Sequence, residues 1–411
     1  MFALPLPTVL RPLAFGTLVS ALGNGAWYAS WALFLIRIAG VPAAQVGLAL
    51  TIAGVAGIAG AVPLGRLADR LGAREVMVAI SVVRALSMAG FVLADDLVAL
   101  TVVASLMAAT QQGSSAVRTA LVAALTTAEE RLDALSSLRV LGHAGDAIGA
   151  AAGALVIQLD TPAAYAALIG FNAVTYLAYA LSAARLPHVD VHVRAPGAAA
   201  VRDPHYLALA AICGVLTLCW AMMSTALPIW VADHTEAPRA LSGVLVVISS
   251  VAIAALQVRA TRTASTPQRA ARVAVLSATA LAASCVLFAL ASGPAAATAA
   301  VVLLAGGVAH VAGELLFVAA SWGLSVPLMP DGRAGEYQGV FATGEAAALA
   351  VAPLLMTVVV VGWGQAGWLA LGALFVVATL PAPAITRGAL RARSRSAAPR
   401  PVPAPAPARS S

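Results

Sequence analysis

The chain contains no lysine and few charged residues of either sign. Charged residues make up 10% of its 411 positions, whereas a soluble domain usually carries about 25%. Hydrophobic residues account for 61% of the chain, and its mean hydropathy is +0.93. A soluble protein of this length could not bury so much apolar surface. The composition therefore excludes a soluble protein and predicts that the surplus apolar surface faces lipid.

Cysteines are also scarce, and catalytic and nucleotide-binding motifs are missing. Cys213, Cys219 and Cys285 lie inside apolar runs without metal-ligand spacing, so we expect them to pack as small apolar residues. The sequence has no Walker-type phosphate loop, no His-Glu-x-x-His motif and no Gly-x-Ser-x-Gly elbow. These absences argue against ATP-driven transport and against an enzyme, and we expect neither a cofactor nor a bound metal.

The chain does contain twelve apolar segments that are long enough to span a bilayer. A proline-rich polar stretch at 186–204 divides them into two sets of six. This pattern predicts an all-α membrane protein with twelve transmembrane helices in two six-helix bundles, over 1–185 and 205–386, followed by a tail over 387–411. The predicted spans are about 13–38, 43–65, 75–94, 97–125, 134–158, 163–185, 205–231, 240–260, 271–292, 295–326, 335–361 and 364–386.

Arginine placement predicts how the helices are oriented in the membrane. With the N-terminus inside, the inner loops and the tail hold most arginines, whereas the outer side holds only Arg37 and Arg239. We therefore expect a multi-pass protein of the inner (plasma) membrane, with both termini and the 186–204 linker in the cytoplasm. The net charge of +7 is spread over loops rather than along one face, so no nucleic-acid partner is expected. The tail from Arg387 is rich in proline and arginine, which predicts disorder.

The most informative motif follows the uncharged apolar run Val46–Leu64. It reads Gly65-Arg66-Leu67-Ala68-Asp69-Arg70-Leu71-Gly72-Ala73-Arg74, and the next apolar run starts at Val76. A tight hairpin between two membrane helices needs glycine where backbones crowd and charges that stay at the water boundary. The pattern Gly-x-x-x-Asp-Arg-x-Gly-x-Arg resembles the loop between helices 2 and 3 of the major facilitator superfamily, whose members are secondary transporters with twelve helices.

This resemblance implies the major facilitator fold, with a substrate site between the two bundles near the membrane midplane. It also implies that the hairpin locks an inner gate near the start of helix 11, with Gly65, Asp69, Arg70, Gly72 and Arg74 as the gate residues. Glu75 departs from the family pattern, in which another basic residue is common. The segment Gly335–Phe341 is similar to the start of helix 11 in bacterial carriers of the superfamily. The alternative is that the hairpin is only a positively charged inner loop.

Glycines recur along the predicted fifth helix. Gly145, Gly149 and Gly153 are spaced by four residues and share one helix face, which would let another helix approach closely. With Gly142, they resemble the helix 5 motif Gly-x-x-x-Gly-Pro-x-x-Gly-Gly of the antiporter branch. Ala150 stands where that motif has proline, and Ala154 where it has its last glycine. Generic packing of small residues is therefore an equal alternative.

Five charged residues lie deep inside predicted spans, namely Arg84, Arg118, Asp146, Glu314 and Glu345. A charge at this depth costs about 2.5–3.5 kcal/mol, so such residues usually face a cavity or a partner. An apolar environment favours the protonated form of a carboxyl group, which suits proton coupling. We interpret Asp146 and Glu314 as coupling or substrate-contact residues and leave Glu345 open. We interpret Arg84 and Arg118 as structural, for example through an ion pair of Arg118 with Asp69 or Asp146.

The first predicted helix has a polar and aromatic face. Asn24, Trp27, Tyr28 and Trp31 follow the i, i+3, i+4, i+7 rule and lie on one side. Such a face suits a cavity that binds flat or cationic organic molecules, and Asn24, Trp27 and Tyr28 are the cavity candidates. An aromatic belt at the outer interface is the alternative, especially for Trp31.

Together these features predict a secondary active transporter of the drug/proton-antiporter-like branch. It would export a small organic molecule, a drug or metabolite, in exchange for protons by alternating access. An uptake carrier or uniporter for a small metabolite is the alternative within transport, and a membrane-embedded enzyme or a non-transporting receptor is a further one. The expected partners are the small-molecule substrate, protons and membrane lipid, and the chain is expected to act as a monomer.

Overall fold

The computed structural model describes residues 5–38, 40–41, 43–94, 96–127, 129–188, 200–238, 241–330 and 333–397. Every regular element within these ranges is helical. The α-helices are α1 (Arg11–Leu33), α2 (Ala43–Leu71), α3 (Ala73–Leu93), α4 (Leu97–Leu125), α5 (Glu130–Leu159), α6 (Pro162–Ala184), α7 (Pro204–Ala221), α8 (Leu227–His234), α9 (Leu241–Arg262), α10 (Pro267–Leu290), α11 (Ala296–Ser325), α12 (Ala334–Leu354), α13 (Gln365–Thr379) and α14 (Ala382–Ala397). Short stretches with other helical geometry are η1 (Thr8–Leu10), η2 (Phe34–Ile38), η3 (Ala200–Arg202), η4 (Met222–Ala226), η5 (Val326–Leu328) and η6 (Leu355–Val361).

The helices confirm the predicted all-α membrane fold. Among the described residues, 11 helical stretches are long and apolar enough to cross a membrane, and α1 adds a further helix of 23 residues. Several stretches combine successive elements. For example, α7, η4 and α8 form one rod over Pro204–His234, and α12 continues through η6 to Val361.

Polar caps and one glycine set where several helices begin. The Asp96 carboxylate accepts a hydrogen bond from the Ala99 amide at 2.7 Å and so caps α4. Thr161 and Thr266 cap α6 and α10 in the same way, each followed by a proline in the first turn. Gly72 separates α2 from α3 with a φ of 102°, which only glycine adopts at little steric cost. The charged hairpin of the sequence is therefore a single tight turn.

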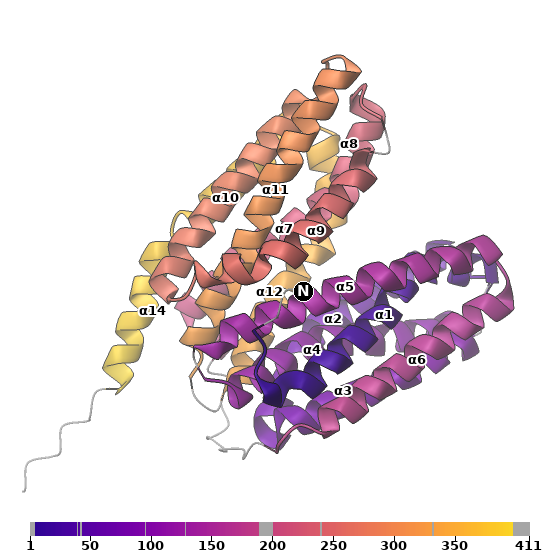
Figure 1. Ribbon diagram of the computed structural model, residues 1–411, viewed down its shortest axis with the longest axis vertical. Coiled ribbons are helices and arrows are strands. Elements are labelled where there is room, and N and C mark those ends of the chain that lie inside the picture. Colours follow the sequence, from indigo (N-terminus) through magenta and orange to yellow (C-terminus); the bar gives the residue numbers. More distant parts are fainter. Residues whose placement is uncertain are drawn as a thin grey trace, which may run out of the picture.

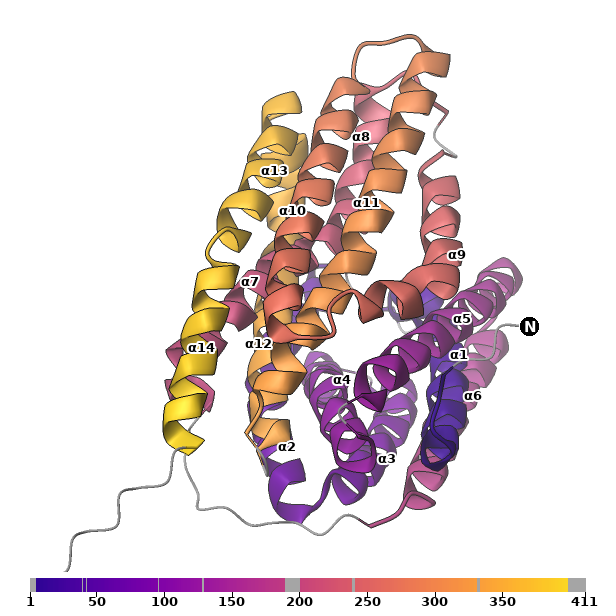
Figure 2. The ribbon, with the colours of Figure 1, turned by 60° about the vertical axis from the view of Figure 1, so that its left-hand side comes forward.

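The helices form two bundles that converge at one end. The N-terminal bundle consists of α1–α6 and the C-terminal bundle of α7–α14 (Figure 1). The bundles diverge toward the α5–α6 turn of one and the α10–α11 turn of the other (Figures 1 and 2). They approach each other toward the end that carries the α2–α3 turn, which we call the hairpin end. The outline is that of a V.

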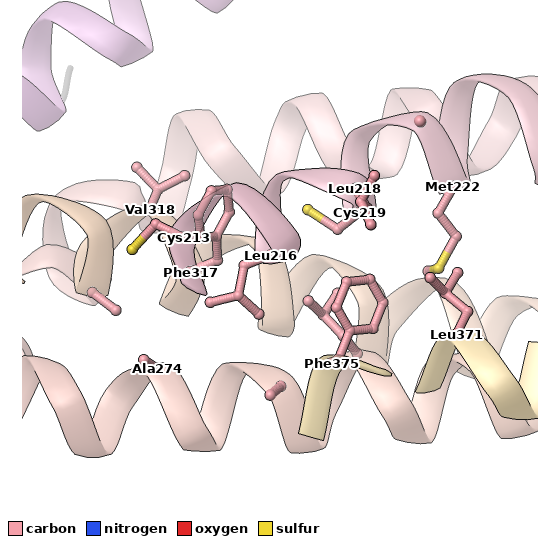
Figure 3. Close-up of a cluster of buried hydrophobic side chains, with 14 of the residues drawn as sticks. Cys213, Leu216, Leu218, Cys219, Met222, Ala274, Phe317, Val318, Leu371 and Phe375 are labelled. Carbon is pink, nitrogen blue, oxygen red and sulfur yellow. The ribbon is translucent and has the colours of Figure 1, made fainter. Parts of the chain in front are cut away.

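Each bundle has its own apolar core. The C-terminal bundle is filled by one large cluster of buried side chains, part of which is drawn in Figure 3. Cys213 and Cys219 of α7 lie in this cluster beside Phe317 (Figure 3). All three cysteines are free and buried, which confirms that they pack as apolar residues. The N-terminal bundle has two smaller clusters, one around Met77 and one around Met88.

The C-terminal helix corrects one prediction. The sequence predicts disorder from Arg387, whereas α14 continues as a helix to Ala397. The closely spaced prolines begin only at Pro399, and the preceding alanines and arginines are good helix formers. Arg393 of α14 forms an ion pair with Asp203 at 3.1 Å, which ties this helix to the start of α7.

Some sequence predictions fall outside the described residues. These are the centre of the linker (189–199), the outer-side residue Arg239, and the end of the tail (398–411).

Candidate functional site

The two bundles touch most closely where α2 crosses the start of α12. A Cβ atom added to Gly65 would overlap the carbonyl oxygen of Gly335, and one added to Gly335 would overlap that of Gly65. A Cβ on Gly339, one turn further along α12, would lie 2.7 Å from the Cα of Val62. Glycines at all three positions therefore let the two backbones approach without a side chain between them.

Asp69 binds the N-terminus of α12 beside this crossing. Its two carboxylate oxygens accept hydrogen bonds from the amides of Gly335 and Glu336, each at 2.7 Å. The first amides of a helix have no partner inside the helix, and the helix dipole favours an anion there. One carboxylate from the N-terminal bundle thus caps a helix of the C-terminal bundle, 266 residues away in the chain.

An ion pair lies next to this cap. The Arg66 guanidinium donates to Glu336 Oε1, with the Nη2–Oε1 distance at 3.2 Å. The Glu336 side chain is buried, whereas that of Arg66 is about one third exposed (36%). Arg333 lies on the other side of Glu336, at 3.7 Å. Two basic residues therefore surround one buried carboxylate at the hairpin end.

The structure places the five residues of the predicted gate motif in different surroundings. Gly65 and Asp69 contact α12, as described. Gly72 forms the turn itself, and Arg74 donates to the carbonyl oxygen of Ala184 at 2.6 Å, within its own bundle. Arg70 is exposed on the surface. The contact across the bundles thus involves Arg66 and Glu336, which the sequence reasoning did not select.

A second contact at the hairpin end joins α5 to α9. Arg262 donates from Nε and Nη2 to the two carboxylate oxygens of Asp133, at 3.2 and 2.9 Å. This geometry is bidentate, so it fixes orientation as well as distance. The arginine side chain is 61% exposed, so the pair contributes little stability of its own. It still joins the bundles, through α5 and α9 rather than through α2 and α12.

A third contact lies deeper, between α5 and α11. Arg139 Nη2 donates to Glu314 Oε1 at 2.9 Å, and both side chains are largely buried. Trp220 Nε1 donates to the same oxygen at 3.1 Å, and the Ser249 hydroxyl lies 3.4 Å from Oε2. His310 Nε2 is 3.7 Å from Oε2. The sequence reasoning selected Glu314 but missed Arg139, although an arginine inside a predicted span was the available signal.

A cavity of about 430 Å³ lies between the bundles next to Arg139. It is polar, and its wall combines residues of both bundles, so it is enclosed only when the two pack together. The charged and polar residues that line it include Ser20, Asn24, Arg84, Gln111, Gln112, Ser115, Arg118, Arg139, His143, Asp146, Ser321 and Glu345. We call it the polar cavity.

A second cavity of about 470 Å³ adjoins the first. The two share Gln111, Gln112 and Leu349 in their walls. The second is mainly apolar, and its aromatic lining comes from Trp27, Tyr28, Trp31 and Phe91. We call it the apolar cavity. The predicted cavity residues are thus divided, because Asn24 lines the polar cavity while Trp27 and Tyr28 line the apolar one.

Asn24 belongs to a buried hydrogen-bonded cluster around Arg84. Arg84 Nη2 donates to Asn24 at 3.3 Å, to the Tyr176 hydroxyl at 2.7 Å, and to Gln111. Its guanidinium carbon lies 4.2 Å from the centre of the Tyr176 ring. Arg84 is only 4% exposed, and its Nε has no hydrogen-bond partner among the residues that the structure describes. All the acceptors in this cluster are neutral.

The deep carboxyl groups differ in how they are paired. Glu314 is engaged by Arg139, as described. Asp146 and Glu345 line the polar cavity, and within the described chain neither forms an ion pair or a side-chain hydrogen bond. Arg118 lines the same cavity, and its guanidinium is not within 4.0 Å of either Asp69 or Asp146, so the ion pair suggested from the sequence is not formed. Asp69 is instead occupied by α12.

The glycine face of α5 packs against α1. A Cβ on Gly145 would meet Ala21, and a Cβ on Gly149 would overlap the carbonyl oxygen of Leu22. Gly25 of α1 completes the crossing, because its own Cβ would overlap the backbone of Asp146. Gly153 is buried further along the helix. The close approach expected of these glycines is therefore present, and it sets the position of Asp146.

Residues 13–353 match the family model of the Major Facilitator Superfamily. The chain belongs to this superfamily. A search of curated protein sequences finds no significant match. Within the described residues, no group of three or more His, Cys, Asp or Glu side chains is arranged to hold a metal ion.

Solved structures of major facilitator proteins share the fold. A bacterial homologue of the iron transporter ferroportin, in an outward-facing state, superposes with a TM-score of 0.72 at 14% identity, covering 94% of this chain and 100% of that chain. The human organic anion transporter MFSD10 (TETRAN) gives a TM-score of 0.70 at 15% identity over 91% of this chain and 98% of that chain. The proton:xylose symporter XylE gives a TM-score of 0.68 at 12% identity, over 91% of this chain and 94% of that chain. The family and these folds identify a secondary transporter of the membrane rather than an enzyme.

Proposed function

We propose that this transporter exports a small organic molecule in exchange for protons, by alternating access. The observation that carries the proposal is the polar cavity between the bundles, which holds unpaired carboxyl groups and lies behind contacts at one end of the V. A cavity of about 430 Å³ suits a small organic solute. Solute bound there would be released to either side by rocking one bundle against the other.

The contacts at the hairpin end supply the gate of this proposal. The Asp69 cap, the Arg66–Glu336 pair and the Asp133–Arg262 pair all join the bundles at that end. If the hairpin end is cytoplasmic, as the arginine distribution predicts, this conformation is closed to the cytoplasm. Opening inward would break these polar contacts and separate the α2–α12 crossing.

Proton coupling is assigned to Asp146 and Glu345 ahead of Glu314. Asp146 and Glu345 line the polar cavity without an ion-pair partner in the described chain, so each could take up a proton without disturbing a contact. Glu314 holds Arg139 across the bundles, so its protonation would loosen the contact between them. Glu314 is therefore proposed as a residue that links the two bundles. Exchange follows if solute and proton compete for the two cavity carboxyl groups.

Everted membrane vesicles with an imposed pH gradient test this function. A panel of small anionic, neutral, cationic and zwitterionic solutes would be offered to vesicles with an acidic interior. We expect at least one solute to accumulate and to be released when nigericin collapses the gradient. Asp146→Asn or Glu345→Gln should abolish accumulation while solute exchange persists, whereas Arg272→Gln, an exposed residue on α10, should behave like wild type.

Two outcomes would contradict the proposal. Accumulation driven by an alkaline interior would indicate that solute and proton move together, as in an uptake carrier. Solute movement that is the same with an acidic interior, an alkaline interior and no pH gradient would indicate a uniporter.

A further inference from the structure

The charged residues that line the polar cavity fall into a paired and an unpaired set. Arg139 is paired, because the carboxylate of Glu314, which is not itself part of the cavity wall, lies 2.9 Å from its guanidinium. Arg84, Arg118, Asp146 and Glu345 all line the cavity, and no ion pair within 4.0 Å joins any of them to each other or to another described residue. Two positive and two negative groups therefore share one cavity without neutralising each other.

Such an arrangement is costly unless something occupies the cavity. Opposite charges in a low-dielectric interior attract strongly and would be expected to pair directly. Here the backbone keeps them apart, because the α1–α5 glycine crossing holds Asp146 while neutral acceptors from three other helices hold Arg84. Arg84 is almost fully buried, and within the described chain its Nε has no hydrogen-bond partner. The other titratable groups in the cavity wall are His143, Tyr179 and the Arg139 that pairs with Glu314.

The cavity has as many unpaired positive groups as unpaired negative ones, and this balance favours one class of ligand over others. A purely anionic ligand would be attracted by the two arginines but repelled by the two carboxylates. A purely cationic ligand would be attracted by the two carboxylates but repelled by the two arginines. A ligand that carries one group of each sign could satisfy both sets. The adjoining apolar cavity, with Trp27, Tyr28 and Phe91 in its wall, would accommodate an apolar body of similar volume.

We propose that the polar cavity binds the charged groups of an amphiphilic zwitterion. Its carboxylate is bound by Arg118 and Arg84, its ammonium group by Asp146 and Glu345, and its apolar body lies in the apolar cavity. The proposal rests on the proposed exchange function and deepens it, because the ammonium group and the proton would use the same two carboxyl groups.

A matched ligand series tests the proposal by calorimetric titration of the purified full-length protein, without any pH gradient. The probes are 2-naphthylalanine (zwitterion), its amide (cation), its N-acetyl derivative (anion) and its N-acetyl amide (neutral). Because a hydrogen bond to a charged group contributes about 1.5–3 kcal/mol, we expect the zwitterion to bind the wild-type protein at least roughly tenfold more tightly than any of the others.

Two variants assign the charged groups. Arg118→Gln should lower the affinity for the zwitterion and for the anion by about tenfold or more and leave the affinity for the cation unchanged. Asp146→Asn should lower the affinity for the zwitterion and for the cation by a similar factor and leave the affinity for the anion unchanged. Arg272→Gln, outside both cavities, is the matched control. A structural role for either residue would instead weaken all four probes together.

The proposal is overturned if the zwitterion binds wild type no more tightly than the neutral probe, a comparison that needs no variant. It is also overturned if both variants leave zwitterion binding unchanged or weaken all four probes equally. Its failure differs from that of the exchange function. Zwitterion binding without gradient-driven movement would contradict proton exchange alone, whereas gradient-driven movement of singly charged or neutral probes alone would contradict the zwitterion site alone.

Discussion

At the residue scale, this transporter uses its few charges in three distinct ways. Asp69 caps a helix of the opposite bundle, and Glu314 pairs with an arginine across the bundles. Asp146 lines the polar cavity without an ion-pair partner among the described residues. All three are carboxyl groups inside or beside apolar helices, so residue type alone does not separate them. Their surroundings do, because a carboxylate held by two amides or by a guanidinium is part of a contact, whereas an unpaired one is available to a ligand or a proton.

Asp69→Asn should slow transport by about tenfold or more while leaving the amount of protein in the membrane near normal. The asparagine side chain is uncharged and has one carbonyl oxygen, so it cannot replace both charge-assisted hydrogen bonds from the Gly335 and Glu336 amides. A hydrogen bond to a charged group contributes about 1.5–3 kcal/mol. The variant should therefore destabilise the state that is closed at the hairpin end. Initial transport rates, normalised to protein abundance by immunoblot, measure the effect.

Asp96→Asn is the matched control for this variant. Asp96 also caps a helix N-terminus through its carboxylate, but within a single bundle. If Asp69→Asn and Asp96→Asn transport equally well, the hairpin motif of this chain is a topology signal and not a gate.

At the element scale, the inter-bundle contacts depend on helix crossings made by glycine. The α2–α12 crossing joins the bundles, whereas the α1–α5 crossing lies within one bundle and positions Asp146. Close glycine crossings suit a moving interface, because the helices meet through backbone rather than through interlocked side chains. The same residue type thus forms a contact between the bundles at one crossing and a contact within one bundle at the other.

Gly65→Ala should shift the protein away from the conformation that is closed at the hairpin end. The added methyl group would overlap the carbonyl oxygen of Gly335, so the two backbones must separate. Spin labels at Leu71 and Ser265, exposed positions at that end of the two bundles, measure the change in a background without native cysteines. We expect a larger population at long distance than in the unmodified background.

Gly170→Ala provides the comparison, because a Cβ at this exposed position of α6 meets nothing within 4 Å. Identical distance distributions for Gly65→Ala and Gly170→Ala would show that the crossing tolerates a side chain and does not control the gate.

At the scale of the whole molecule, the V-shaped arrangement gives the transporter two unlike ends. Polar contacts close the hairpin end, and the bundles diverge toward the other (Figures 1 and 2). Which end faces the cytoplasm decides whether this conformation is open to the outside or to the inside. Arginine placement predicts a cytoplasmic hairpin end.

Single-cysteine labelling tests this orientation. Cysteines at Pro196 and Ser410, both outside the described residues, should resist a membrane-impermeant maleimide added to intact cells, in a background without native cysteines. A cysteine at Ala295, in the exposed α10–α11 turn, should be labelled. Outside labelling at Pro196 or Ser410 would reverse the orientation and with it the inferred direction of the gate.

The sequence by itself determined the helices, their division into two sets and the position of the hairpin. Hydropathy over about twenty residues and the placement of Gly72 between two apolar runs are local properties, so they can be read without knowing the packing. The family also followed from a local motif and was confirmed over residues 13–353. Where the local pattern changed within a segment, as in the tail after Arg387, the boundary was misplaced.

Only the tertiary structure decided which charges meet. Arg139 pairs with a residue 175 positions away, and Arg66 with one 270 positions away, so no spacing in the sequence relates them. The same holds for Arg118 and Asp146, which line one cavity without forming an ion pair, because the crossings of α1, α4 and α5 set their separation. Ion pairing depends on distances of a few ångströms between helices of different bundles, and those distances arise only when the bundles pack.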